Sequence, residues 1–181
     1  MMLVSEFKRI AVVGTSCSGK TTMARRLGRL LNIPHIELDQ LNWLPGWRMR
    51  DRDEFRDLLD KETDADRWII DGNYYKHQDI FLPKATHVVW LNYSFVFIFG
   101  RGLMRTINRI WTKKELFNGC YETFGQSFLS RDSILWWIIK TFPKNRQRYP
   151  TLPNREEFSN IRLIELRSQR EADLLLESIQ K

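Results

Sequence analysis

The stretch Gly14-Thr15-Ser16-Cys17-Ser18-Gly19-Lys20-Thr21 decides the fold class of this chain. It matches the pattern Gly-x-x-x-x-Gly-Lys-Ser/Thr, in which glycines let the backbone wrap closely around a polyphosphate. Successive backbone N–H groups and the N-terminus of the following helix supply positive potential there. In this pattern the lysine reaches the β- and γ-phosphates and the next hydroxyl binds Mg²⁺. Together with Thr22, the stretch therefore predicts an ATP site, with Lys20 on the phosphates and Thr21 on Mg²⁺.

The flanks of this phosphate loop support the prediction. Residues 8–13 are mostly apolar and β-branched, as expected of a buried parallel strand. Residues 22–31 place Ala24, Leu27 and Leu31 on one face of a helix. The alternative, a chance glycine turn before a helix, does not account for the order strand, loop, helix.

The composition is that of an ordinary soluble protein. The chain has 181 residues, 43% of them hydrophobic and 28% charged, which suits one domain over residues 1–181. We expect no N-terminal signal and no membrane partner, because no apolar run approaches the ~20 residues of a span. Only Cys17 and Cys120 are present, so we expect a reducing, cytoplasmic location. Cys17 is better explained as a small residue of the loop than as a reactive thiol.

The net charge of +7, with a pI near 9.6, favours anionic partners. Nucleotides, phosphorylated substrates and nucleic acid all meet that description, so charge alone does not choose among them.

Short apolar segments alternate with helical ones, the pattern of a parallel sheet covered by helices on both faces. The expected strands after the first are residues 35–38, 67–70, 86–91 and 161–166, and the expected helices are 51–62, 94–111, 132–148 and 171–180. The irregular segment at about 112–131 is where we expect a small lid. The sequence therefore predicts a three-layer α/β fold.

The strand at residues 67–70 ends in Asp71-Gly72-Asn73-Tyr74. Asp71 is thus a candidate for the Mg²⁺ site. Many hydrolytic ATPases place a glutamate directly after this aspartate, and here Gly72 follows instead. The Asn-Lys-x-Asp motif with which GTPases read guanine is also missing from the sequence. These features favour transfer to a bound acceptor over hydrolysis.

Asp39 follows the second predicted strand, at the edge of the sheet where ligands of α/β proteins bind. Its carboxylate could orient or deprotonate an acceptor hydroxyl. An N-cap or a turn former is the structural alternative. The loop-like segment 40–48 carries Trp43 and Trp47, which either line an acceptor pocket or cover a small core.

Arg101, Arg105 and Arg109 recur every four residues, so they share one helix face. Arginines stabilise the charge that phosphoryl transfer spreads over oxygens, and we expect Arg105 and Arg109 to do so. A solvated face is the alternative for part of this set. Further cations near the predicted lid are Lys113, Lys114, Arg131, Arg146 and Arg148.

Taken together, the loop, Asp39, Asp71-Gly72 and the arginine helix resemble the adenylate kinase and shikimate kinase branch of phosphate-loop kinases. More narrowly, residues 36–43 and 68–74 resemble bacterial DNA topology modulation proteins, which are adenylate-kinase-like. The resemblance implies a five-stranded parallel sheet in the order 2-3-1-4-5, ATP with Mg²⁺, and a mobile lid.

The chain departs from that pattern in two places. Adenylate kinases continue Asp-Gly with Phe-Pro-Arg, whose arginine helps to hold the monophosphate acceptor, whereas residues 73–76 read Asn-Tyr-Tyr-Lys. AMP is therefore a doubtful acceptor unless Arg48, Arg50 or Arg52 binds its phosphate. The four cysteines of a zinc-bearing lid are missing from the sequence, so no structural metal is expected.

Two hypotheses follow. The first is an ATP-dependent kinase of a nucleoside, nucleotide or other hydroxylated metabolite. The alternative is a nucleotide-dependent, DNA-associated regulator with a basic working surface. We find no recognisable DNA-reading motif in the sequence, which favours the kinase.

Overall fold

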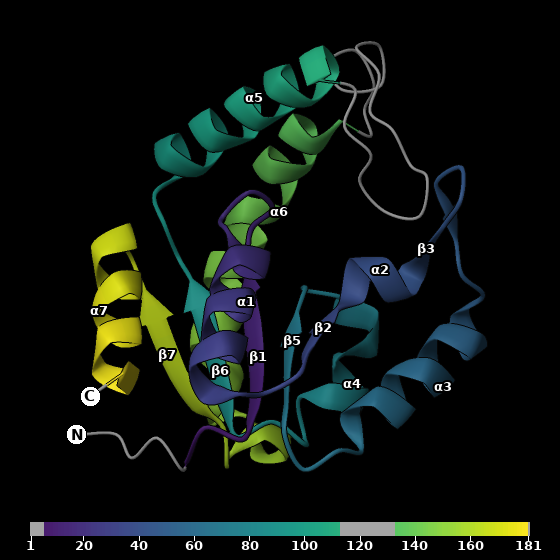
Figure 1. The fold of residues 1–181 in the computed structure, drawn as a ribbon, viewed down its shortest axis with the longest axis vertical. Helices are drawn as coiled ribbons and strands as arrows, with labels where there is room; N and C mark the ends of the chain where they lie inside the picture. Colours follow the sequence, from purple (N-terminus) through teal and green to yellow (C-terminus); the bar gives the residue numbers. More distant parts are fainter. Residues whose placement is uncertain (1–5, 113–132, 181) are drawn as a thin grey trace.

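In the computed structural model of this chain, residues 6–112 and 133–180 are described, without the side chains of residues 109, 110 and 112. Five parallel strands form the central sheet in the order β2-β5-β1-β6-β7 (Figure 1). Their bounds are β1 Arg9–Gly14, β2 His35–Glu37, β5 Trp68–Asp71, β6 His87–Leu91 and β7 Arg162–Leu166. Counted along the chain within this sheet, that order is 2-3-1-4-5, so the predicted topology is confirmed.

Helices cover both faces of the sheet, because the side chains of each strand alternate between them. From β1, Ile10 and Val12 pack in one core cluster with α1 Lys20–Leu31 and α7 Gln169–Gln180. Ala11 and Val13 pack in the other, with α3 Arg52–Thr63 and α4 Gln78–Phe81. The predicted three-layer α/β fold is thus confirmed (Figure 1).

Two further helices, α5 Phe95–Thr112 and α6 Ile134–Arg148, pack against each other beyond the carboxyl end of β6 (Figure 1). Gly102 lies at their contact, where an added Cβ would stand 2.7 Å from Ile138 Cδ1 and would make the end of that side chain move. Apart from Thr112, the predicted lid at about 112–131 lies outside the described residues, as does Cys120. No helix among the described residues is long and apolar enough to cross a membrane.

Residues 40–48, which the sequence indicated to be loop-like, contain regular structure. The helix α2 Leu38–Asn42 begins directly after β2, and an antiparallel ribbon of β3 Trp43–Leu44 and β4 Arg48–Met49 follows. The ribbon turns through Gly46 and Trp47, both with positive φ. Short elements of this kind carry too little periodicity to be seen in a sequence.

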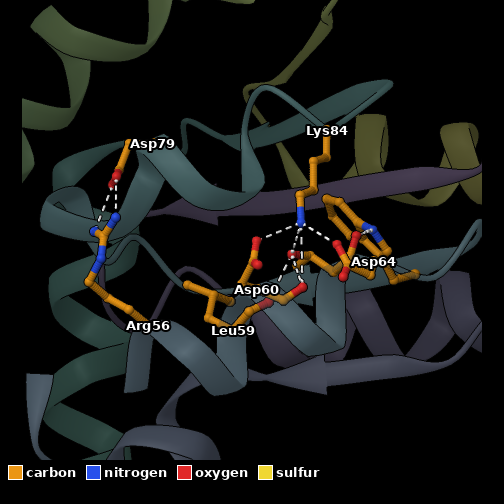
Figure 2. A network of polar contacts seen from close by, with 8 residues as sticks. Arg56, Leu59, Asp60, Asp64, Asp79 and Lys84 are labelled. Atoms are coloured by element: carbon orange, nitrogen blue, oxygen red, sulfur yellow. Dashed lines mark hydrogen bonds and ion pairs between the residues drawn. The ribbon is translucent and has the colours of Figure 1, made fainter. Parts of the chain in front are cut away.

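A surface network joins α3 to the α4 region (Figure 2). Lys84 Nζ lies 2.8 Å from Asp60 and 2.7 Å from Asp64, and Arg56 forms a two-pronged pair with Asp79. Such exposed pairs contribute little to stability, because water screens the charges. The short 3-10 segments η2 Tyr75–His77, η4 Tyr149–Asn154 and η5 Glu156–Phe158 complete the described fold.

Candidate functional site

The phosphate loop joins β1 to α1, as predicted, in a backbone shape that demands glycine at two positions. Gly14 has φ 147° and a Cβ there would lie 2.7 Å from the Leu91 carbonyl oxygen. Gly19 has φ 99° and stands at the N-cap of α1. Between them, the Ser18 N–H donates to the Thr15 carbonyl at 3.1 Å and closes a tight turn. The loop therefore has a compact form with positive φ at both glycines.

The loop side chains differ in what surrounds them. Cys17, with φ 66°, is buried in the core cluster that contains Met23 and Ile138, which agrees with its interpretation as a small packing residue. Ser18 is also buried, and its hydroxyl has no hydrogen-bond partner among the described residues. Ser16 is half-buried and Thr22 is exposed in the first turn of α1. Any contribution of Cys17 to nucleotide binding would come from its backbone.

Lys20 lies over the loop and donates from Nζ to the Thr15 carbonyl at 3.3 Å. Burial lowers the pKa of Lys20, while the negative charges of Asp71 and Asp39 act in the opposite direction. The positive charge of Arg105 also lowers this pKa. The charges of two carboxylates and one arginine thus act on the loop lysine.

Asp71 lies at the carboxyl end of β5, beside β1, and is only 4% exposed. Thr21 Oγ1 donates to its Oδ2 at 2.6 Å, which brings the two predicted metal ligands together. His35 Nε2 lies 2.8 Å from the other oxygen, Oδ1. We did not predict His35, whose place at the start of β2 becomes meaningful only when β2 pairs with β5.

The Thr21–Asp71 pair fits Mg²⁺, which binds proteins through one or two side-chain oxygens and takes its other ligands from phosphates and water. No cluster of three or more His, Cys, Asp or Glu that could hold a metal occurs in the described part of the chain. A cation at this pair would therefore depend on the nucleotide for further ligands.

Asp39 lies in the first turn of α2, one residue beyond the predicted strand. The N-cap of α2 is Glu37, and the Asp39 carboxylate instead accepts a hydrogen bond from the Tyr74 hydroxyl at 2.8 Å. The N-cap interpretation of Asp39 was therefore wrong. Burial raises the pKa of Asp39, while the bond from Tyr74 and the charge of Lys20 lower it. We did not predict Tyr74 as a partner of Asp39. The turn at Gly72 brings its hydroxyl to that carboxylate.

The arginines of α5 with described side chains are Arg101 and Arg105. Arg101 lies against the phosphate loop, since a Cβ at Gly19 would be 3.3 Å from Arg101 Nη2, and its guanidinium stacks on Phe97. Arg105 is half-buried, affects the pKa of both Lys20 and Asp39, and has an Nε without a partner among the described residues. The side chain of Arg109 is outside the described part. Arg101 belongs to the same spacing pattern, but our prediction had chosen only Arg105 and Arg109.

The alternative phosphate-binding arginines lie in the segment around the ribbon. Arg50 donates from Nε to the Leu41 carbonyl at 2.8 Å and pairs with Glu54. Trp43 and Trp47 meet edge to face with ring centroids 5.4 Å apart. Arg50 is therefore held by its own segment, and the acceptor pocket between the tryptophans stays a prediction.

No protein-family model matches the sequence, and no curated protein matches it either. Solved structures do match over nearly the whole chain. The shikimate kinase from Acinetobacter baumannii in complex with shikimate has a TM-score of 0.56 and 18% identity, covering 98% of this chain and 96% of that one. The shikimate kinase from Aquifex aeolicus has a TM-score of 0.52 and 16% identity, covering 94% and 92%.

A gluconokinase from Sinorhizobium meliloti is similar to the same extent, with a TM-score of 0.52, 15% identity and coverage of 96% and 94%. At such low identities the likeness establishes the fold alone. The chain therefore has the fold of phosphate-loop small-molecule kinases, and the narrower resemblance to DNA topology modulation proteins stays a prediction.

Proposed function

We propose that this protein is an ATP-dependent kinase that transfers the γ-phosphoryl group to a hydroxyl of a small molecule. The observation that carries this proposal is the placement of two carboxylates at or just beyond the carboxyl ends of β5 and β2, the strands that follow β1 and its loop in the sheet. Asp71 accepts a hydrogen bond from Thr21 on the donor side, and Asp39 accepts one from the Tyr74 hydroxyl. Burial lowers the pKa of Lys20, and the negative charges of both carboxylates act to raise it. One carboxylate serves the metal and leaves the other for the acceptor.

On the donor side, the loop amides and the N-terminus of α1 would hold the phosphates of ATP. Lys20 would leave the Thr15 carbonyl and bind the β- and γ-phosphates. Thr21 and Asp71 would hold Mg²⁺, which neutralises charge that develops during transfer.

On the acceptor side, Asp39 would accept the proton of the attacking hydroxyl, whose oxygen then bonds to the γ-phosphorus as the bond to ADP breaks. Tyr74 would orient that carboxylate through its hydrogen bond. Arg105, with an unpartnered Nε among the described residues, and Arg109 would stabilise the transferring phosphoryl. Arg101 would add positive charge beside Gly19.

The structure also supports transfer over hydrolysis. A glutamate directly after Asp71 would occupy the position of Gly72, where φ is 142°. A Cβ there would lie 3.1 Å from atoms of both Leu38 and Tyr74. This close packing makes a water-orienting glutamate at that position costly, and none is present.

The DNA-associated alternative gains little from the structure. The helices α5 and α6 contain seven cationic and no acidic residues, which equals the net charge of the whole chain. Of these, Arg101 lies against the phosphate loop, and Arg148 stacks on Tyr75 and donates to Gln78. Arg101 is thus placed for a bound polyphosphate, whereas Lys140, Lys144 and Arg146 are exposed.

The proposal is tested by incubating the protein with ATP, Mg²⁺ and a panel of nucleosides, nucleotides and hydroxy acids. Shikimate and gluconate belong on the panel because enzymes named for them share the fold. We expect one acceptor to gain a single phosphoryl group by mass, with an equal amount of ADP formed. ATP consumption with no phosphorylated product would count against transfer.

A DNA-binding measurement on the same preparation distinguishes the kinase from the DNA-associated regulator. A DNA-binding surface predicts affinity that falls by about one log unit per log unit of salt for each phosphate contact. No binding at low salt would exclude the regulator, and weak binding that ignores sequence would not support it, because any basic protein binds DNA in that way. Tight binding regulated by ATP would support the regulator.

The metal assignment predicts that Asp71→Asn raises the Mg²⁺ concentration needed for half-maximal transfer by about tenfold or more. The reason is that an amide oxygen carries no charge to attract the cation. Titration of activity with Mg²⁺ at saturating ATP measures this change. Asp79→Asn, an exposed carboxylate paired with Arg56, is the matched control and should leave the titration unchanged. An unchanged midpoint in Asp71→Asn would remove Asp71 from the metal site.

A further inference from the structure

The C-terminal end of α6 is hydrogen-bonded to the phosphate loop. Asn145, in the last turn of α6, is only 1% exposed, and its Nδ2 donates to Thr15 Oγ1 at 2.9 Å. The Tyr75 hydroxyl donates to the Oδ1 of the same amide. Both polar atoms of the Asn145 amide are therefore hydrogen-bonded, and its nitrogen binds Thr15, the second residue of the loop.

Thr15 accepts hydrogen bonds from two other residues of the phosphate loop. Its carbonyl oxygen accepts from the Ser18 N–H at 3.1 Å and from Lys20 Nζ at 3.3 Å. Its side chain is buried against Asn145, and the whole residue is 3% exposed. A shift of Thr15 would therefore move the tight turn and the resting position of the loop lysine together.

A second anchor lies one residue away. Asn73 donates from Nδ2 to the Gly14 carbonyl at 2.9 Å and accepts from the Gly14 N–H at 3.1 Å. The hydroxyl of Tyr149, the residue that follows α6, donates to the same Asn73 Oδ1 at 2.8 Å. Tyr149 is completely buried. Both loop residues that precede the phosphate-binding turn are thus bonded, directly or through Asn73, to the end of α6.

An earlier part of α6 packs against α5. Ile138 of α6 fills the space beside Gly102, between Arg101 and Arg105 in the sequence of α5. One helix thus contacts the loop through its last turn and the arginine helix through its middle. Buried hydrogen-bonded side chains with fixed partners make such a link stiff.

On this geometry we propose that Asn145 is a positioning residue for the donor nucleotide, acting through Thr15 to hold the phosphate loop in register with the arginines of α5. This inference rests on the proposed function, since it concerns the same ATP. The opposing interpretation is that Asn145 is a buried polar residue that contributes to folding stability alone.

The test measures the dissociation constant of ATP by calorimetry, and kcat with the acceptor found by the panel. We expect Asn145→Ala and Thr15→Val each to weaken ATP binding about tenfold, the effect of losing one well-made buried hydrogen bond. Because both variants break the same contact, the double variant should also be about tenfold weaker rather than a hundredfold. Thr15→Ser keeps the hydroxyl and should stay within about twofold of wild type.

The matched control is Thr141→Val, one turn earlier in α6. Thr141 is also buried, but its hydroxyl donates to the Trp137 carbonyl of its own helix rather than to the loop. Thr141→Val should lower the melting temperature without changing the affinity for ATP. If Asn145→Ala also lowers only the melting temperature, the inference is overturned. It is equally overturned if the losses of ATP affinity in Asn145→Ala and Thr15→Val multiply in the double variant.

Two further arms keep the outcomes separate. If Asn145→Ala does not fold, Thr15→Val compared with Thr15→Ser decides the same question, and equal affinities for those two variants overturn the inference. If wild-type protein does not bind ATP, the proposed function itself fails. If wild-type protein binds ATP and Asn145→Ala binds it with the same dissociation constant, the positioning role alone is overturned.

Discussion

The Lys20→Met variant is expected to lose phosphoryl transfer by about a thousandfold or more. Methionine fills a similar volume but carries no charge for the β- and γ-phosphates, and such preorganised charge is commonly worth several kcal/mol in the transition state. The fold should persist, because among the described residues the Lys20 ammonium donates to the Thr15 carbonyl alone, at 3.3 Å. Removing a buried charge whose pKa is already lowered by burial should not weaken the core.

The measurement is single-turnover transfer at saturating ATP, with circular dichroism melting as the check on folding. Lys76→Met, at an exposed lysine in η2, is the matched control and should keep wild-type activity. Full turnover by Lys20→Met would refute the assignment of the loop to the donor site.

The Asp39→Asn variant is expected to lower kcat by about 10²–10⁴, the range that general-base catalysis contributes. An amide keeps the shape of the side chain and can still accept from Tyr74, but it cannot take up the proton of the acceptor hydroxyl. The KM for ATP should change little, because Asp71 and Thr21 hold the donor side. Asp57→Asn, an exposed carboxylate on α3, is the control. Loss of ATP binding with kcat unchanged would place Asp39 on the donor side instead.

The dependence of kcat on pH tests the role of Asp39 as a base independently. A base works when it is ionised, so kcat should fall as the pH drops through the pKa of Asp39. Burial raises that pKa above its ordinary value of about 4, so the acid limb should lie above the usual carboxyl range. Tyr74 stabilises the ionised form by its hydrogen bond. Tyr74→Phe should therefore move the limb to still higher pH, and a shift to lower pH would contradict this role.

Much of the donor half of the site could be predicted because its signals are local. The apolar run of β1, the spacing of glycines and the apolar face of α1 lie within about twenty residues, and each constrains its own backbone. The ends of parallel strands meet at one edge of a sheet, so Asp39 and Asp71 could be placed near the loop from strand order alone.

The partners of these residues could not be predicted in the same way. His35 reaches Asp71 only because β2 pairs with β5, and Tyr74 reaches Asp39 only because the chain turns through Gly72. The helix α2 and the ribbon β3–β4 are too short to leave a periodic signal. Arg101 has the same spacing as Arg105, so the sequence did not show which of the two lies against the loop. The approach of Arg101 to Gly19 in the tertiary structure shows this.

By itself, the sequence of the stretch 14–21 determined that a phosphate loop stands between a strand and a helix, since glycine at positive φ and hydrophobic periodicity act over short range. Only the tertiary structure decided what holds that loop. Asn145 meets Thr15 across 130 residues of chain, and Asn73 meets Gly14 across 59. Such contacts depend on how buried helices and strands pack against one another, which no local pattern encodes.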